Sequence, residues 1–208
     1  MSRYEVPTFA WRLAVAALSA ILLLTVLLSG LILLQGMPPA PPQNLLLNAT
    51  AWTLEHGALD HDHLRLQPVS NTIGVAFYPS DMPTLTLQVQ LQIDRAEVAA
   101  GLIYAAQDAD HFSAFLISPD GYFALSDYAA GHWQFRRDWQ TWPHIQRGTT
   151  TNRLRVECVA AACTFFINDE WTWHIDDRVA GPVIGLVAYE LRPDGGGSAR
   201  FEQIEMGR

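Results

Sequence analysis

The sequence predicts an all-β fold of two packed antiparallel sheets, preceded by one transmembrane α-helix. An uncharged apolar run occupies residues 13–34, and from about residue 44 onward apolar and polar residues alternate with period two. Turn-forming residues interrupt the alternation about every ten residues, which is typical of sandwiches and barrels. About a dozen such segments are most economically accommodated in two packed sheets.

The apolar run LAVAALSAILLLTVLLSGLILL is long enough to cross a bilayer. Its 22 residues would extend about 33 Å as a helix. A signal peptide usually has a shorter apolar core, so we expect an uncleaved anchor. Arg3 and Arg12 precede the run, and the next basic residue is Arg65. The positive-inside rule then places residues 1–12 in the cytoplasm. We expect a single-pass protein of the cell membrane with an extracytoplasmic C-terminal domain.

A Pro-rich linker at residues 35–44 is expected to follow the anchor, because GMPPAPP is typical of a short, stiff, extended spacer. The sandwich then occupies residues 45–208. Its clearest strand is TLTLQVQLQID at Thr84–Asp94, where leucine, valine and isoleucine face one side and threonine and glutamine the other. One face of this strand is predicted to be buried and the other wet.

Four sequential strands are predicted next, at Gly101–Gln107, His111–Ser118, Tyr122–Tyr128 and His132–Arg137. The turns between them contain Asp108-Ala109-Asp110, Pro119-Asp120-Gly121 and Ala129-Ala130-Gly131, residues that favour tight reversals. Further strands are predicted at Asn152–Val159, Cys163–Asn168, Glu170–Ile175, Val183–Glu190 and Ala199–Met206.

The two cysteines, Cys158 and Cys163, flank VAAA between two of these strands. If the strands form a hairpin, the cysteines lie opposite one another, within reach of a disulfide. In an oxidising compartment we expect the bond. The alternative is a pair of reduced, buried thiols.

Three segments together resemble exported concanavalin A-like (laminin G-like) jelly-roll domains, close to the bacterial branch that includes 3-keto-disaccharide hydrolase-like domains. They are GLIYAAQDADHFSAFLISPDGYFAL, TNRLRVECVAAACTFFINDEWTWHIDD and GPVIGLVAYELRPDGGGSARFEQIEM. The matching positions are Gly101, Asp108, Asp110, Phe115, Ile117, Gly121, Asn152, Leu154, Val156, Phe166, Asn168, Gly185, Leu186 and Phe201. Asp169 departs from the glycine usual in the Asn-Gly turn. The resemblance implies a jelly roll, a fold that carries lectins, hydrolases and passive spacers alike.

No catalytic residue is predicted. Glycosidases of this general fold place carboxylates on one strand, as in Glu-x-Asp-x-x-Glu, and that pattern is absent from the sequence. The acidic candidates are Asp60-His61-Asp62, Asp108-Ala109-Asp110, Asp169-Glu170 and Asp176-Asp177. All lie at predicted turns, where acidic residues usually cap and solvate the backbone.

No metal site or cofactor is predicted either. His56 and the run from Asp60 to His63 contain residue types that bind zinc, but the run falls between two strand-like pieces, so a polar turn is the favoured interpretation. The resemblance to laminin G-like domains brings calcium into consideration. Asp108 and Asp110 supply too few of the roughly six to eight oxygens that calcium takes, so no calcium site is assigned.

Ligand-binding candidates are concentrated in HWQFRRDWQTWPHIQR and just before it. They are Trp133, Trp139, Trp142, Arg136, Arg137 and Tyr128. Flat aromatic rings with polar neighbours bind the apolar faces of sugars. Core packing is the favoured alternative for Trp133, and also for Trp171 and Trp173, which are expected on one strand face. Trp139 and Trp142 are expected in a longer, more exposed connection.

The formal charge of −8 comes with 13 basic residues, all arginine and without a basic cluster, which argues against nucleic-acid binding. The favoured function is a membrane-anchored, non-catalytic, lectin-like module that binds a glycan or a surface protein. A hydrolase of glycosidic bonds, suggested by the resemblance, and a passive structural ectodomain of an envelope assembly are the alternatives.

Overall fold

A computed structural model describes residues 42–69, 72–80, 84–178, 181–192 and 196–207, together with Ser19, Ile21, Leu23 and Thr25. The chain divides into two units, residues 1–39 and 40–208, and every strand below belongs to the second. Among the described residues, no helix is long and apolar enough to cross a membrane. Except for those four single residues, the predicted tail, span and linker up to residue 41 lie outside the described residues.

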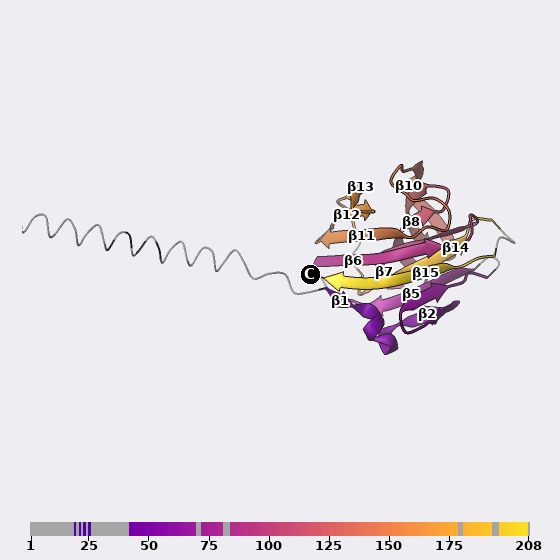
Figure 1. Ribbon diagram of the computed structural model, residues 1–208, viewed down its shortest axis with the longest axis horizontal. Helices are drawn as coiled ribbons and strands as arrows, with labels where there is room; N and C mark the ends of the chain where they lie inside the picture. The colour runs from indigo at the N-terminus through magenta and orange to yellow at the C-terminus, as the bar shows by residue number, and fades with distance from the viewer. Residues whose placement is uncertain are drawn as a thin grey trace, which may run out of the picture. The chain divides into compact units, whose positions relative to one another are not determined.

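The described strands form two antiparallel sheets, which we call sheet A and sheet B (Figure 1). Sheet A contains β1 (Gln43–Asn44), β3 (Gly57–Leu59), β4 (His63–Leu66), β6 (Thr84–Ile93), β11 (Asn152–Val159), β12 (Ala162–Ile167), β13 (Glu170–Ile175) and β15 (Ala199–Gly207). Sheet B contains β2 (Thr53–Glu55), β5 (Ile73–Pro79), β7 (Val98–Asp108), β8 (His111–Ser118), β9 (Tyr122–Ala129), β10 (His132–Thr141) and β14 (Val183–Glu190). Two short 3₁₀ turns, Leu45–Leu47 and Ala49–Ala51, follow β1.

Strands distant in sequence lie side by side in both sheets. In sheet A the order is β13-β12-β11-β6-β15-β4-β3, with β1 also pairing with β15. Figure 1 shows the last strand, in yellow, beside the magenta β6. In sheet B the order is β10-β9-β8-β7-β14-β5-β2. The predicted all-β architecture of two packed antiparallel sheets is therefore confirmed.

The main core lies between the sheets. The alternation in β6 behaves as predicted, because Leu85, Leu87 and Val89 are buried in this core while the intervening threonine and glutamine residues are partly exposed. Tyr104 of sheet B and Phe165 of sheet A pack edge to face across the interior, with ring centroids 5.0 Å apart. Side chains of both sheets thus interdigitate in the usual manner of a β-sandwich.

Two positions matched in the sequence resemblance have clear structural reasons. A Cβ added to Gly101 would lie 1.8 Å from the carbonyl oxygen of Phe115, so only glycine fits between β7 and β8. The side chain of Asn152 is buried and accepts a hydrogen bond from the Asn168 side chain at 2.8 Å. Asn168 also accepts from the backbone nitrogen of Arg153 at 2.8 Å, so this pair fastens the β12–β13 turn to the start of β11.

The predicted strand bounds agree with the structure to within about three residues except in β10, and one interior strand was missed. β10 continues to Thr141, beyond the predicted end at Arg137, so Trp139 lies in a strand and not in a loop. β5 (Ile73–Pro79) was not among the predicted strands, because its residues are buried on both faces and show no alternation.

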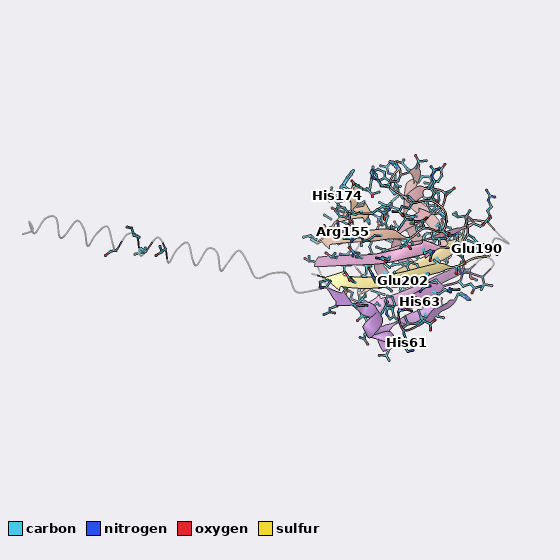
Figure 2. The ribbon with its side chains drawn as sticks, in the orientation of Figure 1. His61, His63, Arg155, His174, Glu190 and Glu202 are labelled. Atoms are coloured by element: carbon cyan, nitrogen blue, oxygen red, sulfur yellow. A yellow bond between two sulfur atoms is a disulfide. The ribbon has the colours of Figure 1, made fainter. Side chains whose placement is uncertain are left out.

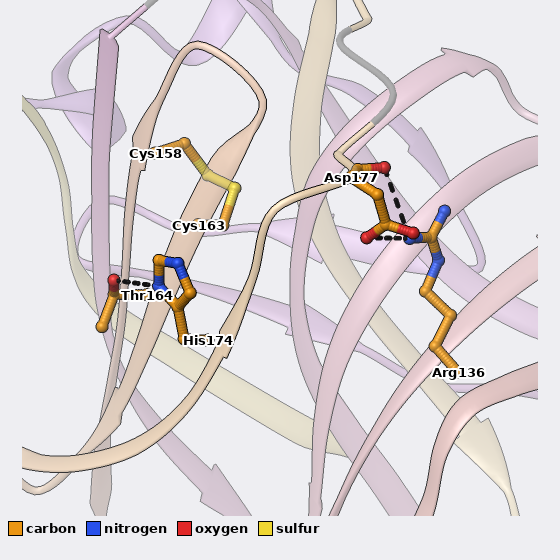
Figure 3. The surroundings of a disulfide bond; sticks show 6 residues. All are labelled: Arg136, Cys158, Cys163, Thr164, His174 and Asp177. Carbon is orange, nitrogen blue, oxygen red and sulfur yellow. Dashed lines mark hydrogen bonds and ion pairs between the residues drawn. A yellow bond between two sulfur atoms is a disulfide. The ribbon is translucent and has the colours of Figure 1, made fainter.

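The predicted disulfide is confirmed. Cys158 and Cys163 are opposite residues of the β11–β12 hairpin, and their sulfur atoms are 2.03 Å apart. The backbone nitrogen of Arg178 donates to the carbonyl oxygen of Ala161 at 2.8 Å. The hairpin tip is therefore connected to the segment that follows β13. Figure 3 shows Asp177 of that segment paired with Arg136, near the disulfide.

Candidate functional site

Sheet B is apolar on both of its faces. Its central strands β7 and β8 are buried along almost their whole length. On the face turned away from sheet A, Ile103, Leu116 and Val187 are fully buried and belong to a second apolar cluster, separate from the core between the sheets. Other side chains of sheet B cover that cluster.

The covering side chains are mainly aromatic. With Phe135 beside them, they form what we call the aromatic surface: Phe77, Phe112, Tyr128, Trp133, Phe135, Trp139 and Tyr189. The ring of Trp133 lies 5.0 Å from that of Tyr128 and 4.8 Å from that of Tyr189. Tyr128 in turn stacks on Phe112 at 4.9 Å. Burial raises the pKa of Tyr189, and a hydrogen bond with Trp139 partly opposes that shift.

Two small pockets open beside the aromatic surface. One, of about 220 Å³, is lined by Thr72, Ile73, Tyr128, Gly131, Trp133, Tyr189 and Glu190. The other, of about 210 Å³, is bordered by Phe112, Tyr128, His111, Asp127 and Arg136 among others. Each combines an aromatic wall with polar groups, which is the composition expected of a small-ligand site.

The six predicted ligand-binding residues fall in three places. Tyr128, Trp133 and Trp139 come together on the aromatic surface. Arg136 and Arg137 reach the cleft between the two sheets, and Arg136 also borders the pocket beside Tyr128. Trp142 packs against the main core, with its ring 5.9 Å from that of Phe123. The candidates therefore do not form one site.

β-Bulges in β10 cause this separation. The pairing of β10 with β9 is irregular between Phe135 and Arg137 and again between Arg137 and Gln140. An extra residue in one strand shifts the side-chain alternation. Phe135 and Trp139 consequently stay on the outer face of sheet B, while both arginines lie on the side of the cleft.

The cleft between the sheets is polar and charged. Arg136 donates to Asp127 at 2.6 Å and pairs with Asp177 at 2.9 Å (Figure 3). Burial alone would lower the pKa of the Arg136 guanidinium, but the two carboxylates outweigh burial and raise it. Ser113 donates to Asp127 at 2.6 Å, so the carboxylate is held from two sides.

The expectation of a shared strand face for the two tryptophans of β13 was wrong, whereas the core packing favoured for Trp173 is confirmed. Trp171 and Trp173 were predicted to share a strand face, but the pairing of β12 with β13 is irregular between Phe165 and Phe166. Trp171 is 54% exposed, whereas Trp173 packs against the main core. The core prediction is likewise wrong for Trp133, which lies on the outer face of sheet B.

The acidic segments lie at turns, as predicted. Asp60, His61 and Asp62 connect β3 to β4, and His63 Nδ1 lies 2.7 Å from Asp62 Oδ1. Figure 2 shows His61 and His63 together on this part of the chain. Asp108 accepts from the backbone nitrogen of Asp110 at 2.9 Å. Among the described residues, no group of three or more His, Cys, Asp or Glu side chains is arranged to hold a metal ion.

Sequence reasoning missed Phe77, Phe112, Phe135, Tyr189 and Asp127 as neighbours of the candidate residues. A usable signal existed for Tyr189, because it lies two residues after Val187 and therefore on the same face of its strand. No signal in the sequence around Phe77 indicated that it lies near β10. Phe77 belongs to β5, and β5 and β10 occupy different positions in the strand order of sheet B.

The two-sheet arrangement is similar to several solved structures. The carbohydrate-binding module CBM66 from Bacillus subtilis matches with a TM-score of 0.55 and 14% identity, over 76% of this chain and 96% of the module. A candidate glycosyl hydrolase from Parabacteroides distasonis matches with a TM-score of 0.54 and 12% identity, over 80% and 98%. The carbohydrate recognition domain of Emp46p, in its potassium-bound form, matches with 0.54 and 12%, over 79% and 91%.

No family model matches the sequence, and no curated protein matches it. Identities of 12–14% show the fold alone. The strand order, the two packed sheets and these similarities agree with the resemblance found in the sequence. The described domain has the concanavalin A-like jelly-roll fold.

Proposed function

We propose that this protein is a non-catalytic glycan-binding module held at the outer face of the cell membrane by residues 13–34. The aromatic surface on sheet B is its binding face. A surface protein as the ligand and a passive structural role are the alternatives. The length of the apolar run and the arginines before it support the anchoring.

The observation that carries the proposal is the cluster around Trp133. Its indole lies between the rings of Tyr128 and Tyr189 and is itself partly exposed. Maintaining such rings on an outer face leaves apolar area in contact with water, which monomeric proteins usually limit. Rings of this kind bind the C–H faces of sugars by burial, while neighbouring hydroxyl and carboxylate groups bind the sugar hydroxyls.

The fold neighbours are consistent with this ligand class. One is described as a carbohydrate-binding module and another as a carbohydrate recognition domain. Because the fold also carries hydrolases, the absence of the Glu-x-Asp-x-x-Glu pattern supports binding without cleavage.

The test uses the full chain in detergent micelles and a panel of polysaccharides. Intrinsic tryptophan fluorescence and release of reducing ends are recorded in the same samples. We expect a saturable change in fluorescence without product. Trp133→Ala should weaken binding about tenfold or more, since stacking on an aromatic ring and its lost burial contribute about 1–3 kcal/mol.

Trp171→Ala is the matched control, because Trp171 is an exposed tryptophan of sheet A outside the aromatic surface. It should leave the affinity unchanged. Equal losses in the two variants would contradict a site on sheet B. Release of reducing ends would overturn the non-catalytic part, and no binding across the panel would favour a protein partner or a structural role.

A further inference from the structure

The cleft between the sheets contains a further cavity, which shares Asp127 and Arg136 with one of the two pockets beside the aromatic surface. It has a volume of about 430 Å³, and its lining includes Asp127, Arg136, Arg137, Trp173 and Asp177. The Arg137 guanidinium lies flat over the Trp173 ring, 3.6 Å from the ring centroid. This stacking holds one edge of a planar cation in a fixed orientation.

Arg137 lacks a carboxylate partner in the described part of the chain. Both acidic residues of the cavity are already paired with Arg136, at 2.6 Å for Asp127 and 2.9 Å for Asp177. The Arg137 Nε atom is buried and has no hydrogen-bond partner among the described residues. The two pairs therefore leave Arg137 without a carboxylate partner of its own in the cavity.

A second uncompensated guanidinium lies directly after Asp177. Arg178 is only 6% exposed, and its Nε and Nη1 atoms have no hydrogen-bond partner within the described ranges. Burial lowers the pKa of the Arg178 guanidinium, and the hydroxyl group of Tyr104, itself buried without a well-formed hydrogen bond, partly opposes that shift. Arg178 does not line the cavity, whose own charged residues are two arginines and two aspartates.

Buried cations without partners are costly, since removal from water is not repaid by an opposite charge. A carboxylate would satisfy Arg137 through two parallel N–H···O bonds, the geometry for which a guanidinium is suited. Both carboxylates of the cavity are held by Arg136, so Arg137 is the guanidinium left to bind a ligand. The cleft thus has the size and the donor group for a ligand carboxylate.

We propose that the cleft binds the carboxylate of a uronic acid unit, with Arg137 as its principal partner and Trp173 beneath that arginine. This inference rests on the proposed function and extends it to glycans that carry a uronate. Asp127 and Arg136 border both this cavity and the pocket that contains Phe112 and Tyr128 of the aromatic surface. One glycan chain can therefore contact the aromatic surface and place a uronate in the cleft.

The experiment is isothermal titration calorimetry of the full chain in detergent micelles with sodium glucuronate, glucose and sodium acetate. We expect glucuronate to bind more tightly than glucose, and more weakly as salt is added. Arg137→Gln should weaken glucuronate binding about tenfold to a hundredfold, since hydrogen bonds to charged groups contribute about 1.5–3 kcal/mol. Arg137→Lys, which keeps the charge but not the paired donors, should cause an intermediate loss.

Arg153→Gln is the matched control, because Arg153 is a partly exposed arginine of sheet A paired with Asp169. It should leave the affinity for glucuronate unchanged, and unaltered thermal melting of each variant checks its folding. The carboxylate site would be overturned if glucuronate bound no more tightly than glucose. It would also be overturned if Arg137→Gln and Arg153→Gln weakened glucuronate binding equally. Acetate binding as tightly as glucuronate would overturn the sugar part of the proposal.

The two proposals fail separately. Trp133→Ala should leave the binding of the single glucuronate unit unchanged while weakening the binding of neutral glycan chains. If neutral glycans bind through Trp133 but glucuronate shows no preference, the cleft proposal is wrong and the glycan-binding module stands. If glucuronate binds through Arg137 but no polysaccharide depends on Trp133, the aromatic surface is wrong and the cleft remains a carboxylate site.

Discussion

The outer faces of the two sheets differ in chemistry although both sheets are antiparallel and share one core. On sheet A the outer face is polar: Gln88 of β6 lies between Arg155 of β11 and Glu205 of β15. Figure 2 labels Arg155 and Glu202 from this sheet. On sheet B the corresponding face has fully buried residues such as Leu116 beneath aromatic rings. Sheet A is a conventional two-sided sheet, whereas sheet B has an additional apolar layer.

The difference follows from the residues at alternate positions. β6 alternates buried leucine, valine or isoleucine with threonine or glutamine, so only one face excludes water. β8 reads HFSAFLIS, and seven of its eight residues are buried. A strand that is apolar on both faces needs a cover on each side. On the outer side of sheet B, residues of the sheet itself, above all Trp133 and Tyr189, supply that cover.

The largest expected effect tests whether the outer face of sheet B is truly core. Leu116→Ala should lower the free energy of unfolding by about 2–5 kcal/mol, because it leaves a cavity under the aromatic rings. Gln88→Ala, on the outer face of sheet A, should change it by about 0.5 kcal/mol or less. Urea unfolding of the full chain in detergent, followed by tryptophan fluorescence, measures both.

Equal costs for the two variants would contradict the distinction between the faces. A small cost for Leu116→Ala alone would mean that the aromatic layer does not exclude water from the sheet beneath it. Leu116 and Gln88 both lie in the interior of central strands, so fraying of strand ends does not affect the comparison of their stabilities.

The buried and exposed faces of sheet A were easier to predict from the sequence than those of sheet B. The alternation in β6 identified its buried face directly, and the hairpin of Cys158 and Cys163 was anticipated from the spacing alone. Alternation carries no such signal in β5, where both faces are buried. That strand was missed for this reason, and the outer apolar layer was not anticipated either.

The candidate site was harder to predict than the fold because of β-bulges. Trp133, Arg136, Arg137 and Trp139 are close in sequence, yet the irregular pairing of β10 places the arginines in the cleft and the tryptophans on the aromatic surface. A bulge depends on how the strand fits its neighbour, and no residue type in β10 marks it. The strand face of Tyr189 could be inferred from Val187, but its position beside Trp133 depends on strand order, which local sequence does not encode.

The second expected effect compares one tryptophan from each outer face. Trp133→Ala removes a ring that contacts Phe112, Tyr128 and Tyr189, and should lower the free energy of unfolding by about 1–3 kcal/mol. Trp171→Ala removes a largely exposed ring and should cost about 0.5 kcal/mol or less. Thermal melting detects the difference. A larger loss for Trp171 would show that the edge of sheet A, and not sheet B, depends on its aromatic side chain.

The smallest expected effect concerns the turns of the two sheets. The β9–β10 turn in sheet B has Gly131 with φ of 85°, whereas the β12–β13 turn in sheet A has Asp169 with φ of 68°. Glycine adopts this left-handed conformation without the cost of about 1 kcal/mol that other residues incur. Asp169 offsets part of that cost, because its carboxylate pairs with Arg153 at 2.6 Å.

Asp169→Gly should therefore change the free energy of unfolding by less than about 0.5 kcal/mol, since relief of the backbone and loss of an exposed ion pair are of similar size. Gly131→Asp, at the corresponding turn of sheet B, should cost about 1 kcal/mol, because no equivalent arginine pairing compensates the left-handed backbone there in the described structure. The double variant Arg153→Gln/Asp169→Gly separates the backbone contribution from the ion-pair contribution. In the Asp169→Gly background Arg153 has no carboxylate at position 169 to pair with, so adding Arg153→Gln should cost little. A large additional loss of stability would mean that Arg153 stabilises sheet A through another contact.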